Sequence, residues 1–144
     1  MIQKSKNQNS KIKNTIQNSK LKDANQNYKS NLKNRCYQFS LKIINLTNNL
    51  PNKRSAWVIT DQLIRAATSV GANLVEARAS SSRLEFKKFY EISLKSANET
   101  KYWLCLLRDA KLTEEKIINF LLEEITEISN MLAAGVIKLK NKHF

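Results

Sequence analysis

Residues 62–77 read QLIRAATSVGANLVEA, and this stretch decides the interpretation of the whole chain. Its apolar and small residues recur in alternating steps of three and four, which is the spacing of one face of an α-helix. Similar spacing before and after it predicts four helices. The predicted core positions are, helix by helix, Leu32, Cys36, Phe39, Ile43, Leu46 and Leu50; Ile59, Leu63, Ala66, Val70, Asn73 and Ala77; Phe86, Phe89, Ser93, Ser96, Thr100, Trp103 and Leu107; and Ile117, Leu121, Ile125, Ile128, Leu132, Gly135 and Leu139. Four such helices with short connections predict an all-α, antiparallel up-down-up-down four-helix bundle.

Helix boundaries are marked by residues that stop or cap a helix. Pro51 ends the first predicted helix. Ser82 and Glu85 have the spacing of a capping box, so the third helix is predicted to open there. A turn near Lys111 separates the last two helices. The N-caps predicted for the second and fourth helices are Ser55 or Thr60, and Thr113.

The composition argues against catalysis. The chain has two glycines and one proline, too few for a fold with many turns or for a glycine-rich phosphate loop. Its one histidine, His143, lies next to the C-terminus, and Cys36 and Cys105 lack the paired spacing of a zinc site. We predict that the protein is not an enzyme and holds no cofactor or metal. The two cysteines are predicted to be buried in a reducing compartment, with a reactive thiol as the alternative.

The net charge of +13 is the strongest indication of a partner. It favours polyanions, meaning RNA, DNA or an acidic membrane surface. No apolar run has the length of a membrane span or of a signal-peptide core, so a cytoplasmic location is predicted. The N-terminal region lacks the aromatic or leucine face of a membrane-surface helix, so no membrane partner is expected.

Composition changes sharply near residue 31. Among residues 1–34 there are eight Asn, eight Lys, four Gln and four Ser, so 24 of the 34 residues are of four polar types. Such a segment cannot bury enough apolar surface to offset the entropy cost of ordering it. Residues 1–30 are therefore predicted to form a disordered basic arm, and residues 31–144 the bundle. The arm is either a nucleic-acid-binding element or a product of compositional drift or a misassigned start codon.

Basic residues recur along the third predicted helix. Seven-residue steps would place several of them on one outer side of that helix, together with Tyr102. Such a stripe could follow a phosphate backbone, and the alternative is an ordinary solvated face. The predicted nucleic-acid-binding residues are Lys87, Lys88, Lys95, Lys101 and Arg108.

A second polar group is predicted between the second and third helices. Small residues on both helices would let the two backbones approach closely, and Asn73 would fix their register. In the predicted register Arg65 forms a partly buried ion pair with Glu99, and Glu76 lies opposite Glu85. Because no histidine or nucleophile lies beside Glu76 and Glu85, these two carboxylates are not predicted to be catalytic. The predicted structural polar core comprises Gln62, Arg65, Ser69, Asn73, Glu76, Glu85 and Glu99.

Residues 62–77, followed by Ser82-x-x-Glu85-Phe86-x-x-Phe89, resemble the four-helix-bundle family of 23S rRNA intervening-sequence proteins. That family's pattern is close to Q-hydrophobic-R-R-A-x-x-S-I-P-A-N-I-A-E-G, then S-x-x-E-F-x-x-F. The resemblance covers roughly residues 32–140. Three positions depart from the pattern, with Ala66 for the second arginine, Gly71 for the proline and Ala77 for the glycine.

The resemblance implies a homo-oligomeric ring, typically a pentamer, of a protein linked to insertions in ribosomal RNA. The accessory variability determinant of diversity-generating retroelements has a similar basic bundle that binds reverse transcriptase and nucleic acid. Two functions are therefore expected. The preferred one is a non-catalytic homo-oligomeric bundle that associates with RNA. The alternative is an accessory subunit that docks a protein such as a reverse transcriptase.

Overall fold

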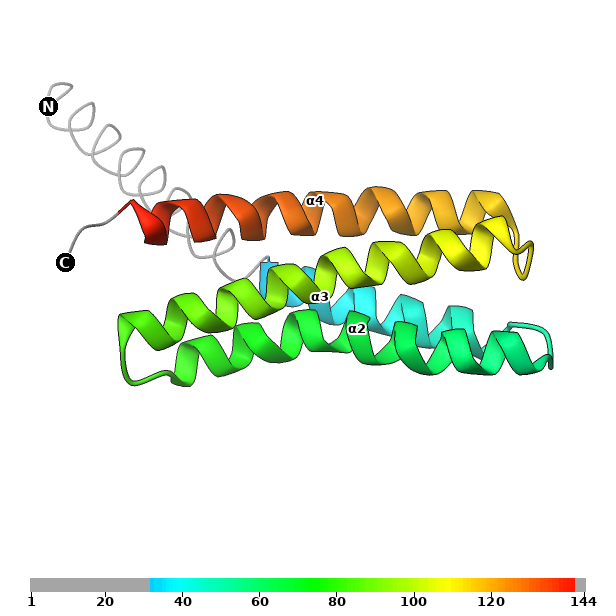
Figure 1. Ribbon diagram of the computed structural model, residues 1–144, viewed down its shortest axis with the longest axis horizontal. Coiled ribbons are helices and arrows are strands. Elements are labelled where there is room, and N and C mark those ends of the chain that lie inside the picture. The colour runs from blue at the N-terminus through cyan, green and yellow to red at the C-terminus, as the bar shows by residue number, and fades with distance from the viewer. Residues whose placement is uncertain (1–31, 142–144) are drawn as a thin grey trace, which may run out of the picture. The chain divides into compact units, whose positions relative to one another are not determined.

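The computed structural model describes residues 32–141, and every structural statement below concerns that part of the chain. Its four helices follow one another up, down, up and down (Figure 1). They span residues 32–48, α2 (Arg54–Ala79), α3 (Arg83–Asp109) and α4 (Glu115–Lys140). The predicted all-α four-helix bundle is confirmed. The predicted disordered arm, residues 1–30, lies outside the described residues.

The core lies along the centre of the bundle, and most of it matches the predicted positions. The first helix buries Cys36, Phe39, Ile43 and Leu46, as expected. In α4 two predictions are wrong. Ile118 and Val136 are buried where Ile117 and Gly135 were expected, and Ile117 is 44% exposed. The buried residues of α4 follow the 3.6-residue period of a straight helix, which turns position 117 away from the core.

The aromatic residues of α3 are less buried than predicted. Phe86, Phe89 and Trp103 are half-buried, whereas Ala97 and Leu104 are fully buried. Small side chains thus occupy the centre of this helix, and the large rings lie at the margins of the core.

The start of α3 is capped by its own sequence. The Ser82 hydroxyl accepts a hydrogen bond from the backbone N–H of Glu85 at 3.1 Å. The Glu85 carboxylate accepts from the backbone N–H of Ser81 at 2.9 Å, which lowers the pKa of Glu85. The predicted capping box is confirmed, with its return bond one residue earlier than the usual pattern.

The predicted N-caps of the other two helices are wrong. Lys53 precedes α2 and Glu114 precedes α4, and neither side chain makes a capping hydrogen bond. Instead the turn after Pro51 closes with a backbone hydrogen bond from Lys53 to the Pro51 carbonyl at 2.8 Å. The tight turn, rather than a capping hydroxyl, sets the start of α2.

Hydroxyl groups join α2 to α3 along their shared seam. The buried Ser93 hydroxyl donates to the backbone carbonyl of Val70 at 2.7 Å. One turn away, the hydroxyls of Ser69 and Ser96 are 2.9 Å apart. Asn73 donates to the Ser69 carbonyl and hydroxyl at 2.8 and 2.9 Å. A side-chain hydroxyl reaches a helical carbonyl on the neighbouring helix only where the two backbones lie close, so the small residues of this seam set the helix separation.

The Tyr90 ring of α3 packs against Gly135 of α4. A Cβ atom at this position would lie 2.8 Å from Cε1 of Tyr90. Tyr90 is half-buried, stacks on Phe86 with ring centroids 5.1 Å apart, and has its pKa raised by burial. The ring therefore has little freedom to move away.

We expect Gly135→Ala to destabilise the bundle by about 1–2 kcal/mol, because the new methyl group overpacks the Tyr90 ring. Helix propensity alone would predict a gain of about 1 kcal/mol. In a Tyr90→Ala background the clash is gone, and the same substitution should stabilise by about that amount. Urea unfolding of the four proteins measures both values. A stabilising Gly135→Ala in the wild-type background would contradict the close approach.

Candidate nucleic-acid interface

The five basic residues predicted to line the outer side of α3 do not share one face. The Lys101 ammonium donates to the Ser129 hydroxyl of α4 at 2.6 Å. The Arg108 guanidinium donates to Asp109 at 2.9 Å and to Asn119 of α4 at 3.1 Å. Both side chains therefore reach across the groove between α3 and α4. The prediction of a continuous outer stripe is wrong.

The remaining residues of that set point elsewhere. Lys88 and Lys95 are exposed on the outer side of α3, and Lys87 is half-buried. Tyr102 continues the line of Lys88 and Lys95 and is 59% exposed. A nucleic-acid role for the five residues stays a prediction, with Lys101 and Arg108 already engaged in bonds to α4.

Positive charge gathers instead at one end of the bundle. This end is formed by the end of α2, the start of α3 and the end of α4 (Figure 1). Six basic side chains lie there against three acidic ones, Glu76, Glu85 and Glu91. We name this region the basic end, and its basic residues are Arg78, Arg83, Lys87, Lys88, Lys138 and Lys140.

Lys140 pairs within the bundle, with its Nζ 3.9 Å from Glu91 Oε1. Lys88 and Lys138 are exposed. With six basic and three acidic residues, the basic end has a net excess of three positive charges, out of six for residues 32–141 as a whole.

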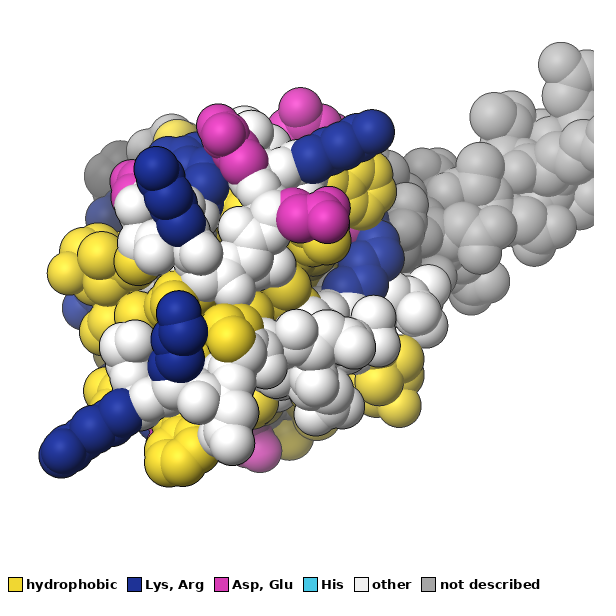
Figure 2. Space-filling model, turned by 90° about the vertical axis from the view of Figure 1, so that its right-hand side faces the viewer, with side chains coloured by type: hydrophobic (Ala, Val, Ile, Leu, Met, Phe, Trp, Pro, Cys, Tyr) yellow, Lys and Arg dark blue, Asp and Glu magenta, His cyan; other side chains and the backbone are white. Residues whose placement is uncertain are grey.

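The opposite end of the bundle is nearly balanced. It carries five basic residues (Lys53, Arg54, Arg108, Lys111 and Lys116) and four acidic ones (Asp61, Asp109, Glu114 and Glu115). Figure 2 shows this end, where side chains of both signs lie beside exposed hydrophobic ones. Charge thus distinguishes the two ends of an otherwise regular bundle.

The predicted Arg65–Glu99 ion pair forms, but on the surface. Arg65 Nη2 lies 3.6 Å from Glu99 Oε1, and the side chains are 70% and 44% exposed. Arg65 also donates to Gln62, and the Trp103 indole N–H donates to Glu99 at 3.1 Å. The prediction of partial burial is wrong, because both residues lie on the outward flank of the α2–α3 seam.

The predicted approach of Glu76 to Glu85 does not occur. The pairs Val70–Ser93 and Ser69–Ser96 set the register of α2 against α3, and they place Glu76 level with Lys88. Glu85 is engaged by Ser81, and Glu76 is exposed. The polar core of the seam is therefore the group Ser69, Asn73, Ser93, Ser96 and Thr100.

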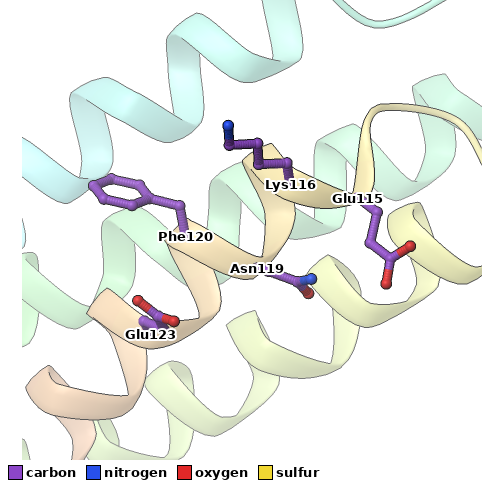
Figure 3. A pocket seen from close by; sticks show the side chains of 5 residues that line it. All are labelled: Glu115, Lys116, Asn119, Phe120 and Glu123. Atoms are coloured by element: carbon purple, nitrogen blue, oxygen red, sulfur yellow. The ribbon is translucent and has the colours of Figure 1, made fainter.

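One shallow hollow of the described surface lies on α4. It is lined by Glu115, Lys116, Asn119, Phe120 and Glu123, and their side chains diverge from one another (Figure 3). Across residues 32–141 no three histidine, cysteine or acidic side chains are grouped to hold a metal ion. Cys36 is buried, which raises the pKa of its thiol to about 12, so the thiol is protonated and unreactive at neutral pH.

Two apolar surfaces were missed by the sequence analysis. The first lies on the outward sides of the first helix and α2, and we name it the apolar face: Tyr37, Leu41, Ile44, Trp57, Ile64 and Val75. All of these except the half-buried Ile64 are at least 40% exposed. The spacing of Tyr37, Leu41 and Ile44 is itself helical, so a second apolar stripe opposite the core was the available signal.

The second apolar surface is a groove of about 730 Å³ between the first helix and α4. It lies at the end of the bundle opposite the basic end, and we name it the end groove. Its apolar lining consists of Leu46, Leu112, Ile117, Phe120 and Leu121. Lys42 borders it, with its ammonium 2.7 Å from Glu124 and 5.5 Å from the centroid of the Phe120 ring.

No helix within residues 32–141 combines the length and the apolar character needed to cross a bilayer.

Comparison with known proteins identifies relatives of the bundle. The profile of a family described as 23S rRNA-intervening sequence protein matches residues 28–134. A solved structure from Bacteroides thetaiotaomicron, described as a protein with unknown function from the S23 ribosomal protein family, is 34% identical. The match covers 73% of this chain and 97% of that chain, with a TM-score of 0.69. No curated protein matches the chain.

The exposure of the Arg65–Glu99 pair generates a prediction. A double-mutant cycle with Arg65→Ala and Glu99→Ala should give a coupling free energy of at most about 0.5 kcal/mol, because water screens both groups. Urea unfolding of the four proteins provides the measurement. A coupling above about 1 kcal/mol would show that the pair is desolvated in solution.

Proposed function

Because the chain belongs to the 23S rRNA-intervening sequence protein family, we propose that it is a non-catalytic, homo-oligomeric bundle that associates with RNA. The observation that carries the RNA half of the proposal is the basic end. Lysine and arginine side chains on a rigid surface neutralise backbone phosphates without reading bases, so the expected binding tolerates many sequences.

The rest of the chain adds to this charge. Residues 1–31 contain seven lysines and one acidic residue, Asp23. These residues add a net six positive charges to the chain.

Self-association is supported by the apolar face. Monomeric proteins rarely expose contiguous apolar patches beyond a few hundred Å² without a partner. The apolar face runs from residue 57 to residue 75 along α2, about 27 Å at 1.5 Å per residue. Association would multiply weak phosphate contacts through multivalency.

The proposal that the protein is not catalytic is supported by the side chains of residues 32–141. The hollow on α4 presents diverging side chains (Figure 3), and burial raises the pKa of the Cys36 thiol far above neutrality. A general acid–base or nucleophilic mechanism needs such groups to converge on one substrate atom.

A second function, docking of another protein such as a retroelement reverse transcriptase, is favoured by the same apolar face. That face fits a heterologous protein as well as a second copy. The two functions predict different gene neighbours, a ribosomal RNA insertion in the first case and an adjacent reverse transcriptase in the second.

RNA association predicts a salt-dependent affinity that depends on the basic end. We expect the quadruple variant Lys87→Gln, Lys88→Gln, Lys138→Gln and Lys140→Gln to bind a structured RNA about tenfold or more weakly at low salt. Its slope of log affinity against log salt should also be smaller, because each lost phosphate contact removes about 0.7–0.9 from the slope. A salt titration of binding by fluorescence anisotropy measures both quantities.

The opposite end provides a matched control. Neutralising Lys53, Arg54, Lys111 and Lys116 removes the same number of charges, and it should change the slope much less. Equal losses in the two variants would mean that net charge alone, rather than the basic end, drives binding. Undetectable binding by the intact protein at about 50 mM salt would reject the RNA function and favour protein docking.

A further inference from the structure

We propose that a single-stranded segment of RNA runs along the outer side of α3 from the basic end, with an unpaired base stacked on the Tyr102 ring. This inference rests on the proposed RNA association, and it names the class of RNA and the surface that would select it. We name this surface the α3 track, and its residues are Lys88, Lys95 and Tyr102.

The three residues of the α3 track follow one another at seven-residue steps. Such steps are close to two full helical turns, so the three side chains project from one side of α3. All three are exposed, and Tyr102 is 59% exposed. The axial distance from Lys88 to Tyr102 is about 21 Å at 1.5 Å per residue. Because Lys88 belongs to the basic end, the track leads from that end along most of α3.

The Tyr102 ring is supported by neighbouring side chains of α3 and α2. It meets the Trp103 ring edge to face, with centroids 5.0 Å apart and an angle of 75° between the ring planes. The Trp103 indole N–H donates to Glu99 at 3.1 Å. Glu99 in turn lies 3.6 Å from Arg65 of α2. These contacts restrict the two rings before a partner binds, so stacking a base on Tyr102 costs less side-chain entropy.

Acidic side chains near the track already have basic partners. Glu91 lies 3.9 Å from Lys140 of α4. Glu99 pairs with Arg65, as described above. By contrast, Lys95 forms no ion pair with any residue from 32 to 141. Its ammonium group can therefore neutralise a phosphate without giving up a partner inside the bundle.

An exposed aromatic ring in line with two lysines favours unpaired bases. In duplex RNA the base faces are stacked on one another, and side chains cannot read the deep, narrow major groove. The unstacked bases of a single strand can instead stack on a tyrosine ring, and every base can do so. Charge alone would favour the duplex, because each phosphate contact to a duplex releases more counterions. Stacking on Tyr102 is therefore the feature that would select the single strand.

One RNA presented in two forms tests the proposal. The probe is a single strand of about 16 nucleotides without internal complementarity, compared with the blunt duplex that it forms with its complement. We expect the full chain to bind the single strand about tenfold or more tightly than the duplex at equal salt, because only the single strand offers bases to Tyr102. Fluorescence anisotropy measures both affinities.

Substitutions in the track separate stacking from charge. Tyr102→Ala should bind the single strand about tenfold more weakly, the loss typical of one base stack, and the duplex like wild type. It removes no charge, so its slope of log affinity against log salt should be unchanged. Tyr102→Phe keeps the ring and should bind both RNAs like wild type. Lys95→Gln should instead lower the slope on the single strand by about 0.7. Phe120→Ala, which removes a 61% exposed ring from α4, is the matched control and should leave binding unchanged.

Each other outcome overturns a defined statement. If the full chain binds the duplex at least as tightly as the single strand, or if Tyr102→Ala binds the single strand like wild type, the α3 track is wrong and RNA association stands. If Phe120→Ala weakens binding as much as Tyr102→Ala does, the assignment of stacking to Tyr102 is wrong. If the intact chain binds neither RNA at about 50 mM salt, the proposed RNA association fails too. Circular dichroism melting of each variant establishes that it is folded.

Discussion

The close approach of α2 and α3 is the constraint on which the rest of the bundle depends. Small side chains allow it, and the hydrogen bond from Ser93 to the Val70 carbonyl, together with the Ser69–Ser96 contact, fixes its register. A helical carbonyl rarely accepts a bond from a neighbouring helix unless the two backbones nearly touch. Once these two helices are placed, the first helix and α4 cover the open side of the pair and bury their apolar stripes against it.

This register also decides which charges meet. It brings Arg65 within 3.6 Å of Glu99 on the outer flank and leaves Glu76 level with Lys88. The first helix is tied to α4 by ion pairs, while its other side, toward α2, carries exposed apolar residues. The bundle therefore has a charged flank, an apolar flank and one basic end.

The apolar flank and the basic end are the two surfaces on which the proposed function rests. A bundle that exposes an uncharged apolar flank and gathers positive charge at one end is compatible with the proposed self-association and RNA binding. Within residues 32–141, no three histidine, cysteine or acidic side chains are grouped to hold a metal ion.

The sequence by itself determined the four helices, most of the core and the capping of α3 by Ser82, because apolar period and capping chemistry are local properties of the chain. It also indicated a polar seam at Ser69 and Asn73. Only the tertiary structure decided the orientation of the long charged side chains. Lys101 turns to Ser129, and the basic residues of three helix ends meet at one place, because such contacts depend on helix rotation and register between segments far apart in the chain. A periodic pattern defines the side of a helix that is buried, but the neighbour on each flank is set by packing.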